Sequence, residues 1–325
     1  MLNSSHPNFD KMDELSAKKV PFFFMVDFLV DTVEIYTEDE LSENNLLINF
    51  QTFTNTDNHH EKHKNIQLES FPESIEKYKK GFEKVQEHLR LGNSYLTNYT
   101  CKTEIEINLN LKEIFYSSKA KYKVLYKDQF VFFSPETFVE IIDHEIFTHP
   151  MKGTIDAAIE NATEVLKNDR KEKAEHYTVV DLLRNDLSMV ADKVKVNEFQ
   201  RIDFLKTNRK NLYAMSSKIS GKLKPEFINR IGSIMKKILP AGSILGAPKS
   251  KTLEIILNAE NYDRGFYTGV CGWFDGNNLD SCVMIRFIEK ENGKLYFKSG
   301  GGITHLSNFA DEHQEMKNKI YVPIH

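Results

Sequence analysis

The sequence has 325 residues, of which 40% are hydrophobic and 28% are charged, a composition typical of a folded globular protein. Its formal net charge of −4 gives no basic excess that would attract nucleic acid, so no DNA or RNA partner is expected. Three scattered cysteines, no signal-peptide pattern and no apolar run of membrane-spanning length predict a cytoplasmic protein without a membrane partner.

The first part of the chain alternates between hydrophobic and polar residues in short runs. The expected strands are 22–26, 33–36 and 46–50. The polar stretch 55–64 is expected to be a loop. Helical spacing of apolar residues then predicts a helix over 74–91, ended by Gly92.

Beyond residue 94, clusters of strands and helices follow one another without a regular strand–helix–strand alternation. The expected strands are 94–98, 124–126, 130–133 and 138–142, followed by 266–274, 281–288 and 294–298 in one antiparallel sheet. The expected helices are 157–190, 227–238, 251–257 and 309–320. This order predicts the α+β fold class.

Two pairs of glutamates share an i, i+3 spacing, Glu172 with Glu175 and Glu312 with Glu315. On a helix both carboxylates of a pair lie on one face, and two such pairs brought together would suit a hard cation such as Mg²⁺. Glutamates are mostly exposed, so a solvated helix surface is the more frequent explanation of either pair alone.

Two glycine-containing runs, 240–249 and 298–303, precede predicted helices, and the second follows a predicted strand. Backbone N–H groups in such runs can approach an anion closely. Neither run matches a phosphate-binding or dinucleotide fingerprint, and either alone is more often an ordinary turn. Arg286 falls in a predicted apolar strand, so it needs an internal acid or a bound carboxylate as its partner.

Several short motifs occur in one order along the chain. They are Ser134-Pro135-Glu136, the run from His149 to Thr154, Glu175-His176 leading into 180–187, the run 240–249, the run from Arg264 to Gly269, Ile285-Arg286, and Gly300 to Gly302 followed by Glu312, Glu315 and Lys319. Together they resemble the chorismate-binding enzymes over about residues 75–322. That family includes the large subunits of anthranilate and aminodeoxychorismate synthases, and the isochorismate and salicylate synthases.

The resemblance implies an α+β fold in which antiparallel sheets form a sandwich-like core surrounded by helices. It further implies one chorismate-binding domain over residues 1–325, with a shortened N-terminal region over about 1–70. Chorismate would be the substrate and Mg²⁺ the cofactor, with Glu175 and Glu315 as metal ligands and Glu172 and Glu312 in support. The residues expected to line the pocket are Gly153, Thr154, Ser243, Tyr267, Arg286, Gly301, Gly302 and Lys319, with Tyr267 and Arg286 on the enolpyruvyl carboxylate.

Two positions separate the members of this family. Enzymes that add water to the ring carry a lysine base where this sequence has Leu96, a side chain that cannot activate water. In the Pro-x-x-Gly-Thr motif, aminodeoxychorismate synthases carry a lysine where other members usually carry alanine, and this sequence has Lys152. The resemblance therefore implies an aminodeoxychorismate synthase, with Lys152 as the nucleophile and Glu136 as the proton donor. Ala214 stands where the anthranilate enzymes carry a histidine that helps to eliminate pyruvate.

The expected product is 4-amino-4-deoxychorismate, a precursor of 4-aminobenzoate and folate. No glutaminase pattern is present, so ammonia from glutamine is expected from a separate glutamine amidotransferase subunit. Anthranilate synthase component I is the alternative enzyme. A scaffold that only binds the amidotransferase is the alternative from another class, and the presence of Glu136, Lys152, Glu175 and Glu315 counts against it.

Overall fold

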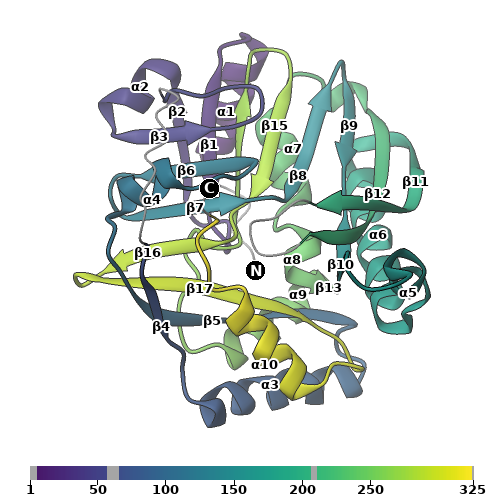
Figure 1. The fold of residues 1–325 in the computed structure, drawn as a ribbon. Coiled ribbons are helices and arrows are strands. Elements are labelled where there is room, and N and C mark those ends of the chain that lie inside the picture. Colours follow the sequence, from purple (N-terminus) through teal and green to yellow (C-terminus); the bar gives the residue numbers. More distant parts are fainter. Residues whose placement is uncertain (1–5, 57–65, 206–210, 324–325) are drawn as a thin grey trace.

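A computed structural model describes residues 6–56, 66–205 and 211–323, and in it the chain forms two antiparallel sheets (Figure 1). The strands of one sheet cross those of the other, and helices lie on the outer sides of both. No helix in the described ranges is long and apolar enough to cross a membrane.

The first sheet contains nine strands of the described chain, in the order β10, β12, β9, β8, β15, β14, β1 and β2, with β11 paired to β12. Their bounds are β1 Phe22–Val26, β2 Val33–Thr37, β8 Thr137–Ile142, β9 Glu145–Thr148, β10 Met151–Asp156, β11 Ala191–Leu205, β12 Leu212–Leu223, β14 Val270–Phe274 and β15 Leu279–Val283. Strand β1 is paired on both sides, since Phe24 pairs with Ile35 of the edge strand β2 and with Gly272 of β14.

The second sheet contains eight described strands, in the order β13, β5, β17, β16, β7, β6 and β3, with β4 paired to β5. Their bounds are β3 Leu46–Asn49, β4 Leu68–Phe71, β5 Leu96–Ile107, β6 Tyr122–Tyr126, β7 Phe130–Ser134, β13 Gly246–Ala247, β16 Phe287–Glu291 and β17 Lys294–Ile303. The ladder between β5 and β17 runs from Ile105 opposite Leu295 to Thr97 opposite Ile303. This long ladder carries the triple glycine to the edge of the molecule where the candidate site lies.

The helices cover the outer faces of the two sheets. Their bounds are α1 Asn8–Ala17, α2 Glu38–Glu43, α3 Ile75–Arg90, α4 Leu111–Ser117, α5 Ala162–Asn168, α6 Arg170–Val190, the 3₁₀ helix Pro225–Phe227, α7 Ile231–Ile238, α8 Gly242–Leu245, α9 Lys249–Ala259 and α10 Phe309–Asn318. Helices α6 and α7 belong to the first sheet, whereas α3, α9 and α10 lie against β5 and β17.

The side chains of β1 show how the layers are held together. Phe22 and Phe24 point into the core between the first sheet and its helices, whereas Phe23 and Met25 point into the core between the two sheets. Successive side chains of a strand face opposite sides, so a strand with both faces covered must be apolar throughout. The four layers are therefore helices, sheet, sheet and helices, which confirms the expected sandwich-like α+β core.

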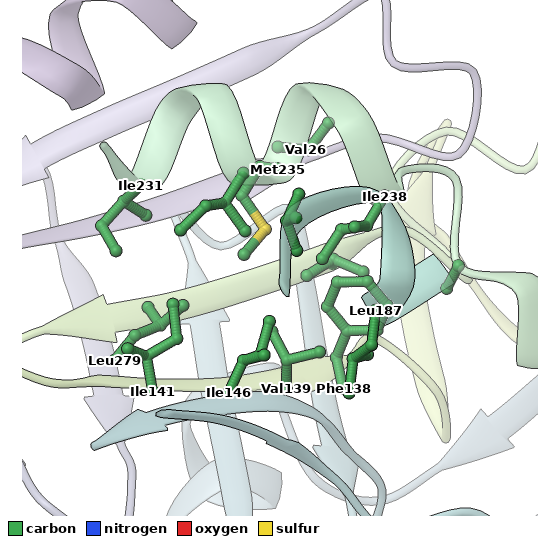
Figure 2. Close-up of a cluster of buried hydrophobic side chains, with 14 of the residues drawn as sticks. Val26, Phe138, Val139, Ile141, Ile146, Leu187, Ile231, Met235, Ile238 and Leu279 are labelled. Atoms are coloured by element: carbon green, nitrogen blue, oxygen red, sulfur yellow. The ribbon is translucent and has the colours of Figure 1, made fainter. Parts of the chain in front are cut away.

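Helix α7 illustrates how the outer layer packs (Figure 2). Ile231, Met235 and Ile238 recur at helical spacing and pack on the first sheet, where they meet Ile141 and Leu279. All five side chains are at most 3% exposed. Truncating one of them to alanine would cost about 2–5 kcal/mol, since a cavity would be left in a closely packed layer.

The predicted helix over 157–190 is wrong as a single element. Residues 157–161 form turns, and the helical part divides into α5 and α6 at Asp169, whose backbone is extended at φ −64° and ψ 121°. The Asp169 carboxylate accepts a hydrogen bond from the backbone N–H of Glu172 at 2.9 Å. This N-cap starts the helix that carries Glu172 and Glu175.

The prediction that 266–274, 281–288 and 294–298 share one sheet is also wrong. Residues 266–269 form turns before β14, and the chain leaves the first sheet after Val283 and enters the second at Phe287. Arg286 thus lies between two strands and not inside one. The triple glycine lies within β17 instead of following it. Alternation of apolar residues does not reveal such a crossing, because the residues on either side of it, β15 and the start of β16, are all buried.

Other boundaries moved by a few residues. The helix expected to begin at residue 227 begins at Ile231, and the one expected over 251–257 extends over Lys249–Ala259. The helix with Ser74 as its N-cap and the C-terminal helix are confirmed. Most of the loop expected at 55–64 lies outside the described residues.

Candidate active site

The chain passes between the two sheets at two neighbouring places, and each crossing carries a predicted site residue. Glu136 lies between β7 and β8, and Arg286 lies between β15 and β16. The backbone N–H of Val283 donates to the carbonyl of Glu136 at 3.2 Å, and the N–H of Phe133 donates to the carbonyl of Arg286 at 3.2 Å. These reciprocal hydrogen bonds fix the two crossings side by side at the edge of the sandwich.

The carboxyl group of Glu136 is enclosed by cations. Its Oε1 accepts a hydrogen bond from the Ser243 hydroxyl at 3.2 Å. Burial raises the pKa of Glu136, while the nearby charges of Lys152, Arg286 and Lys319 act in the opposite direction. A carboxyl group with a raised pKa can retain a proton and donate it, which suits the predicted role of Glu136.

Arg286, at the second crossing, has an unusual backbone conformation and an unsatisfied side-chain donor. Its backbone is left-handed at φ 55°, and its Nε has no hydrogen-bond partner among the described residues although it is buried. The guanidinium carbon lies 5.3 Å from the centre of the Tyr321 ring. A buried donor without an acceptor is costly, so the position favours a bound carboxylate. Tyr267 is buried next to this group, and that burial raises the pKa of its hydroxyl.

Lys152 lies on β10 beside the triple glycine of the other sheet. A Cβ atom added to Gly302 would lie 3.7 Å from Lys152 Nζ and 3.1 Å from Leu96 Cδ1. Lys152 and Leu96 occupy the two positions that distinguish the members of the family, and both side chains therefore lie next to Gly302. Leu96 is itself buried, so the amine has an apolar neighbour.

Gly153 shapes the strand next to Lys152. The register of β10 against β12 shifts between Lys152 and Thr154, and Gly153 has a left-handed φ of +77°. A Cβ atom at Gly153 would lie 2.8 Å from Glu172 Oε2. A side chain there would be strained and would push the glutamate away. Thr154 follows with an exposed side chain and pairs across the ladder with Ala214.

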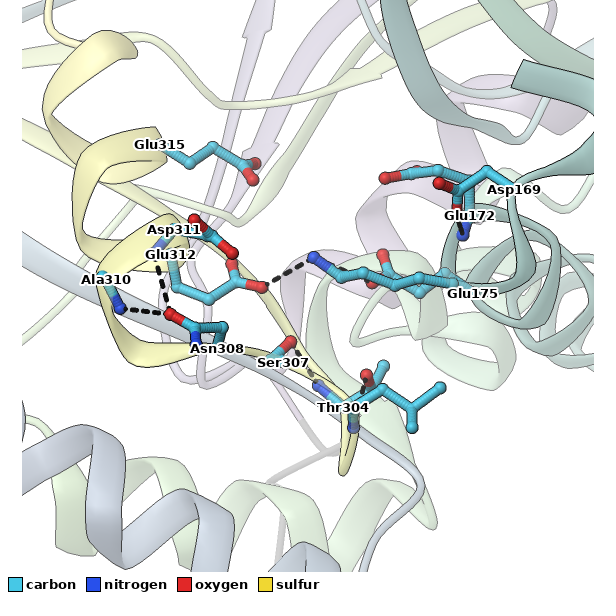
Figure 3. Close-up of polar contacts among 12 residues, drawn as sticks. Asp169, Glu172, Glu175, Thr304, Ser307, Asn308, Ala310, Asp311, Glu312 and Glu315 are labelled. Carbon is cyan, nitrogen blue, oxygen red and sulfur yellow. Dashed lines mark hydrogen bonds and ion pairs between the residues drawn. The ribbon is translucent and has the colours of Figure 1, made fainter. Parts of the chain in front are cut away.

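The four predicted metal ligands come from α6 and α10, whose side chains point toward one another (Figure 3). Lys171 connects the two helices, with its Nζ 3.0 Å from Glu312 Oε1 and 3.9 Å from Glu175 Oε1. Lys319 lies 2.7 Å from Glu315 Oε1 and donates to the carbonyl of Gly300 at 2.7 Å. A Cβ atom on Gly301 would lie 3.5–3.6 Å from Glu312, Glu315 and Lys319.

Several of these carboxyl groups resist ionisation. Burial raises the pKa of Glu175 to about 7, and the charge of Glu172 adds to the effect while Lys152 opposes it. Burial also raises the pKa of Glu172, with further contributions from Asp169 and Glu315. Burial acts in the same direction on Glu315, but Lys319 outweighs it and lowers the pKa of that group. A bound cation would offset the cost of burying these charges.

The four carboxylates that the resemblance assigns to Mg²⁺ are ligands of the type that a hard cation prefers, but they are not gathered in this arrangement. Among the described residues, no three His, Cys, Asp or Glu side chains are gathered closely enough to hold a metal ion. Lys171 pairs with Glu312 and Lys319 with Glu315, so these ammonium groups now supply the positive charge. Burial without a compensating cation raises the pKa of Glu175, and a divalent cation bound to its carboxylate would offset that cost.

Most of the predicted site residues are thus brought together at one edge of the sandwich. The glutamates, Lys152, Glu136, Ser243, Arg286, Tyr267, the glycines and Lys319 are linked by the contacts and charge interactions described above. Lys171 was missed by the sequence reasoning. Its position four residues before Glu175, on the same helix face, was the available signal.

Comparison with known proteins agrees with this geometry. The sequence profile described as chorismate binding enzyme matches residues 13–325. The chain belongs to the chorismate-binding enzyme family. The match begins at residue 13, whereas the motifs alone placed the resemblance at about 75–322. Fold and family are therefore those expected, and the chain is an enzyme of a family that acts on chorismate.

Relatives of this chorismate-binding enzyme fall into two groups. An uncharacterized PabA-like protein of Pasteurella multocida is 45% identical over 99% of this chain and 99% of its own length. Aminodeoxychorismate synthase component 1 of Escherichia coli is 30% identical and covers 75% of this chain but only 56% of its own length. Anthranilate synthase component 1 of Bacillus subtilis is 31% identical, with 73% of this chain and 48% of that protein covered.

Solved structures share the fold. Anthranilate synthase component I of Streptococcus pneumoniae superposes with a TM-score of 0.67 at 26% identity, covering 78% of this chain and 58% of that one. The menaquinone-specific isochorismate synthase of Escherichia coli superposes with a TM-score of 0.65 at 18% identity, covering 78% of this chain and 60% of that one. The second likeness concerns the fold alone.

Proposed function

We propose that this enzyme is an aminodeoxychorismate synthase component I, which converts chorismate and ammonia to 4-amino-4-deoxychorismate. Ammonia would come from a separate glutamine amidotransferase subunit, and the product would feed 4-aminobenzoate and folate synthesis. One observation carries the proposal. The Lys152 amine faces Gly302 beside the apolar Leu96, and its charge acts on both Glu136 and Glu175.

The alternatives within the family differ at these same positions. Ring hydration needs a base that activates water, and Leu96 supplies none at the place next to Gly302. Pyruvate elimination by the anthranilate enzymes uses a histidine at the position of Ala214, which is buried here opposite Thr154. A nucleophilic amine is the reactive group that remains.

The proposed reaction has two steps. In the first, the neutral amine of Lys152 forms a bond to ring C2, the ring double bonds shift, and the C4–O bond breaks. Hydroxide is a poor leaving group, so Glu136 protonates it and it leaves as water. In the second step, ammonia forms the C4–N bond and the C2–N bond breaks, which returns Lys152 as a free amine. The proton that the added nitrogen loses restores the acid form of Glu136.

The remaining residues bind and orient the substrate. Arg286 and Tyr267 would hold the enolpyruvyl carboxylate, and the N–H groups of Gly301 and Gly302 would approach the ring. Glu175 and Glu315, with Glu172 and Glu312 in support, would hold Mg²⁺. When bound, the ion would neutralise the acidic helices and hold the ring carboxylate of chorismate.

The test is product formation by the purified chain with chorismate, ammonium and Mg²⁺, followed by addition of the lyase that releases 4-aminobenzoate. We expect 4-aminobenzoate, and we expect it to disappear when EDTA removes the metal. Anthranilate and pyruvate as the only products would refute the proposal.

Lys152→Ala should lower turnover on the order of 100-fold or more, because a nucleophile is lost. Lys222→Ala, on the exposed part of β12, is the matched control and should leave turnover unchanged.

A further inference from the structure

Two residues of the sequence motifs have no role in the reaction described so far. Asp186 of the run 180–187 lies on α6, and Lys249, the last residue of the run 240–249, begins α9. The structure joins them, since Lys249 Nζ lies 2.7 Å from Asp186 Oδ1 and also donates to the carbonyl of Ile238 at 2.8 Å. Asp186 is only 4% exposed, so this is a buried ion pair.

The second oxygen of Asp186 faces the short segment between these motifs. A Cβ atom at Gly242 would lie 2.7 Å from Asp186 Oδ2, so the backbone can approach the carboxylate only because this residue is glycine. The N–H of Gly242 stabilises the negative charge, although Oδ2 makes no full hydrogen bond within the described chain. The carboxylate on α6 therefore lies directly against the backbone of Gly242.

The next residue after Gly242 touches the reaction centre. Ser243 donates to Glu136 Oε1 at 3.2 Å, and Glu136 is the proposed proton donor. On the far side of α8, Ile244 packs with Leu183 and Leu187 of α6 in the core of the first sheet. The short helix is thus held to α6 by an apolar contact and by the buried ion pair.

We propose that Asp186, held by Lys249, is a positioning residue that fixes Ser243 against Glu136. Asp186 does not touch the substrate, and it acts through Gly242 and Ser243. The buried pair sets the separation between α6, which carries the metal ligands, and the segment that orients the acid. This inference rests on the proposed function, because Glu136 is the acid only in that reaction.

The test is a double-mutant cycle between Asp186→Asn and Ser243→Ala. A displacement of about 1 Å at a catalytic group can cost up to about 100-fold in rate, so we expect Asp186→Asn to lower kcat on the order of tenfold. If Asp186 acts through Ser243, the same change made in Ser243→Ala should lower kcat less than about twofold, since coupled residues are not additive. An equal loss in both backgrounds would overturn the proposal.

Asp181→Asn is the matched control, because Asp181 lies on the same helix in an exposed ion pair with Arg184. It should leave kcat and the melting temperature unchanged. Lys249→Met removes the same ion pair from its more exposed partner. If Asp186→Asn fails to fold, Lys249→Met should show the same fall in kcat. A crystal structure of a folded variant of the pair gives a readout that needs no activity. Ser243 released from Glu136 would support the link, and an unchanged contact would refute it, whereas an inactive wild type would refute only the proposed function.

Discussion

Individual charged groups in the candidate site have opposite preferences for ionisation. Glu175 resists ionisation, with a pKa of about 7, whereas Lys319 keeps the pKa of the neighbouring Glu315 low. Arg286 presents a buried Nε without an acceptor in the described part of the chain. In the proposed reaction, Mg²⁺ would compensate the charge of the carboxylates, and a carboxylate of the substrate would accept from Arg286.

The first residue-scale prediction concerns Arg286. Replacement by alanine removes a charge-assisted contact worth about 1.5–3 kcal/mol, so we expect KM for chorismate to rise about 10- to 100-fold. Arg286→Lys should not restore it, because an ammonium group cannot form the paired contact. Steady-state kinetics measure the effect, with the exposed Arg184→Ala on α6 as the control. A fall in kcat at constant KM would instead place Arg286 in the chemical step.

The second concerns the stability cost of ionising Glu175. Its pKa in the folded chain is about 7, above the ordinary value of 4.5, so the stability it contributes is fully present below pH 4.5. That stability is lost as the pH rises through 7. In EDTA at pH 8, Glu175→Gln should therefore raise the free energy of unfolding by up to about 3 kcal/mol, and at pH 5 by much less.

Urea unfolding at both pH values measures this difference, with the exposed Glu164→Gln on α5 as the control. Added Mg²⁺ should stabilise the wild type more than the variant, because only the wild type keeps the full ligand set. A Glu175→Gln variant less stable than the wild type at pH 8 would contradict this prediction. It would show that other groups of the chain already balance the negative charge of Glu175 without metal.

Helix α6 is the element on which the site depends most. Its N-cap Asp169 starts the turn that carries Glu172, and Asp186 near its other end contacts Gly242. We expect Asp169→Ala to lower the free energy of unfolding by about 1 kcal/mol, because the N–H of Glu172 loses its acceptor. Asp169→Asn keeps an acceptor and should be nearly neutral. Equal losses in urea unfolding would mean that the charge, and not the cap, matters.

The sequence predicted elements best where one pattern repeats without interruption. The amphipathic spacing of α3 and Gly92 just beyond its end placed that helix correctly. The break at Asp169 was hidden, because an N-cap within a polar stretch resembles the solvated face of a longer helix. The crossing at Arg286 was hidden as well, since its left-handed backbone follows from the meeting of two sheets and not from local residues.

The same distinction applies to the site. The residues of the site were found from motifs, because chemistry restricts which residue types can stand there. The contacts among them could not be found in this way. The link from Lys249 through Asp186 and Gly242 to Ser243 depends on buried distances that only the packed chain defines.

On the scale of the whole molecule, the two sheets bring together halves of a site that are far apart in the sequence. Lys152 and the α6 glutamates belong to the first sheet and its helix, whereas Gly302 and the α10 glutamates belong to the second. Each half alone lacks residues that the proposed reaction uses. The amination chemistry proposed for this enzyme therefore depends on the packing of the sandwich.

The position of the new nitrogen on the ring tests this account most directly. The measurement is an incubation of the purified chain with chorismate, Mg²⁺ and ¹⁵N-labelled ammonium. NMR of the product then identifies the ring carbon that carries the ¹⁵N. Attack by Lys152 at C2 leaves C4 for ammonia, so the account predicts ¹⁵N at C4, and no such product from Lys152→Ala above a small residual rate. Label at C2, with anthranilate as the product, would contradict it.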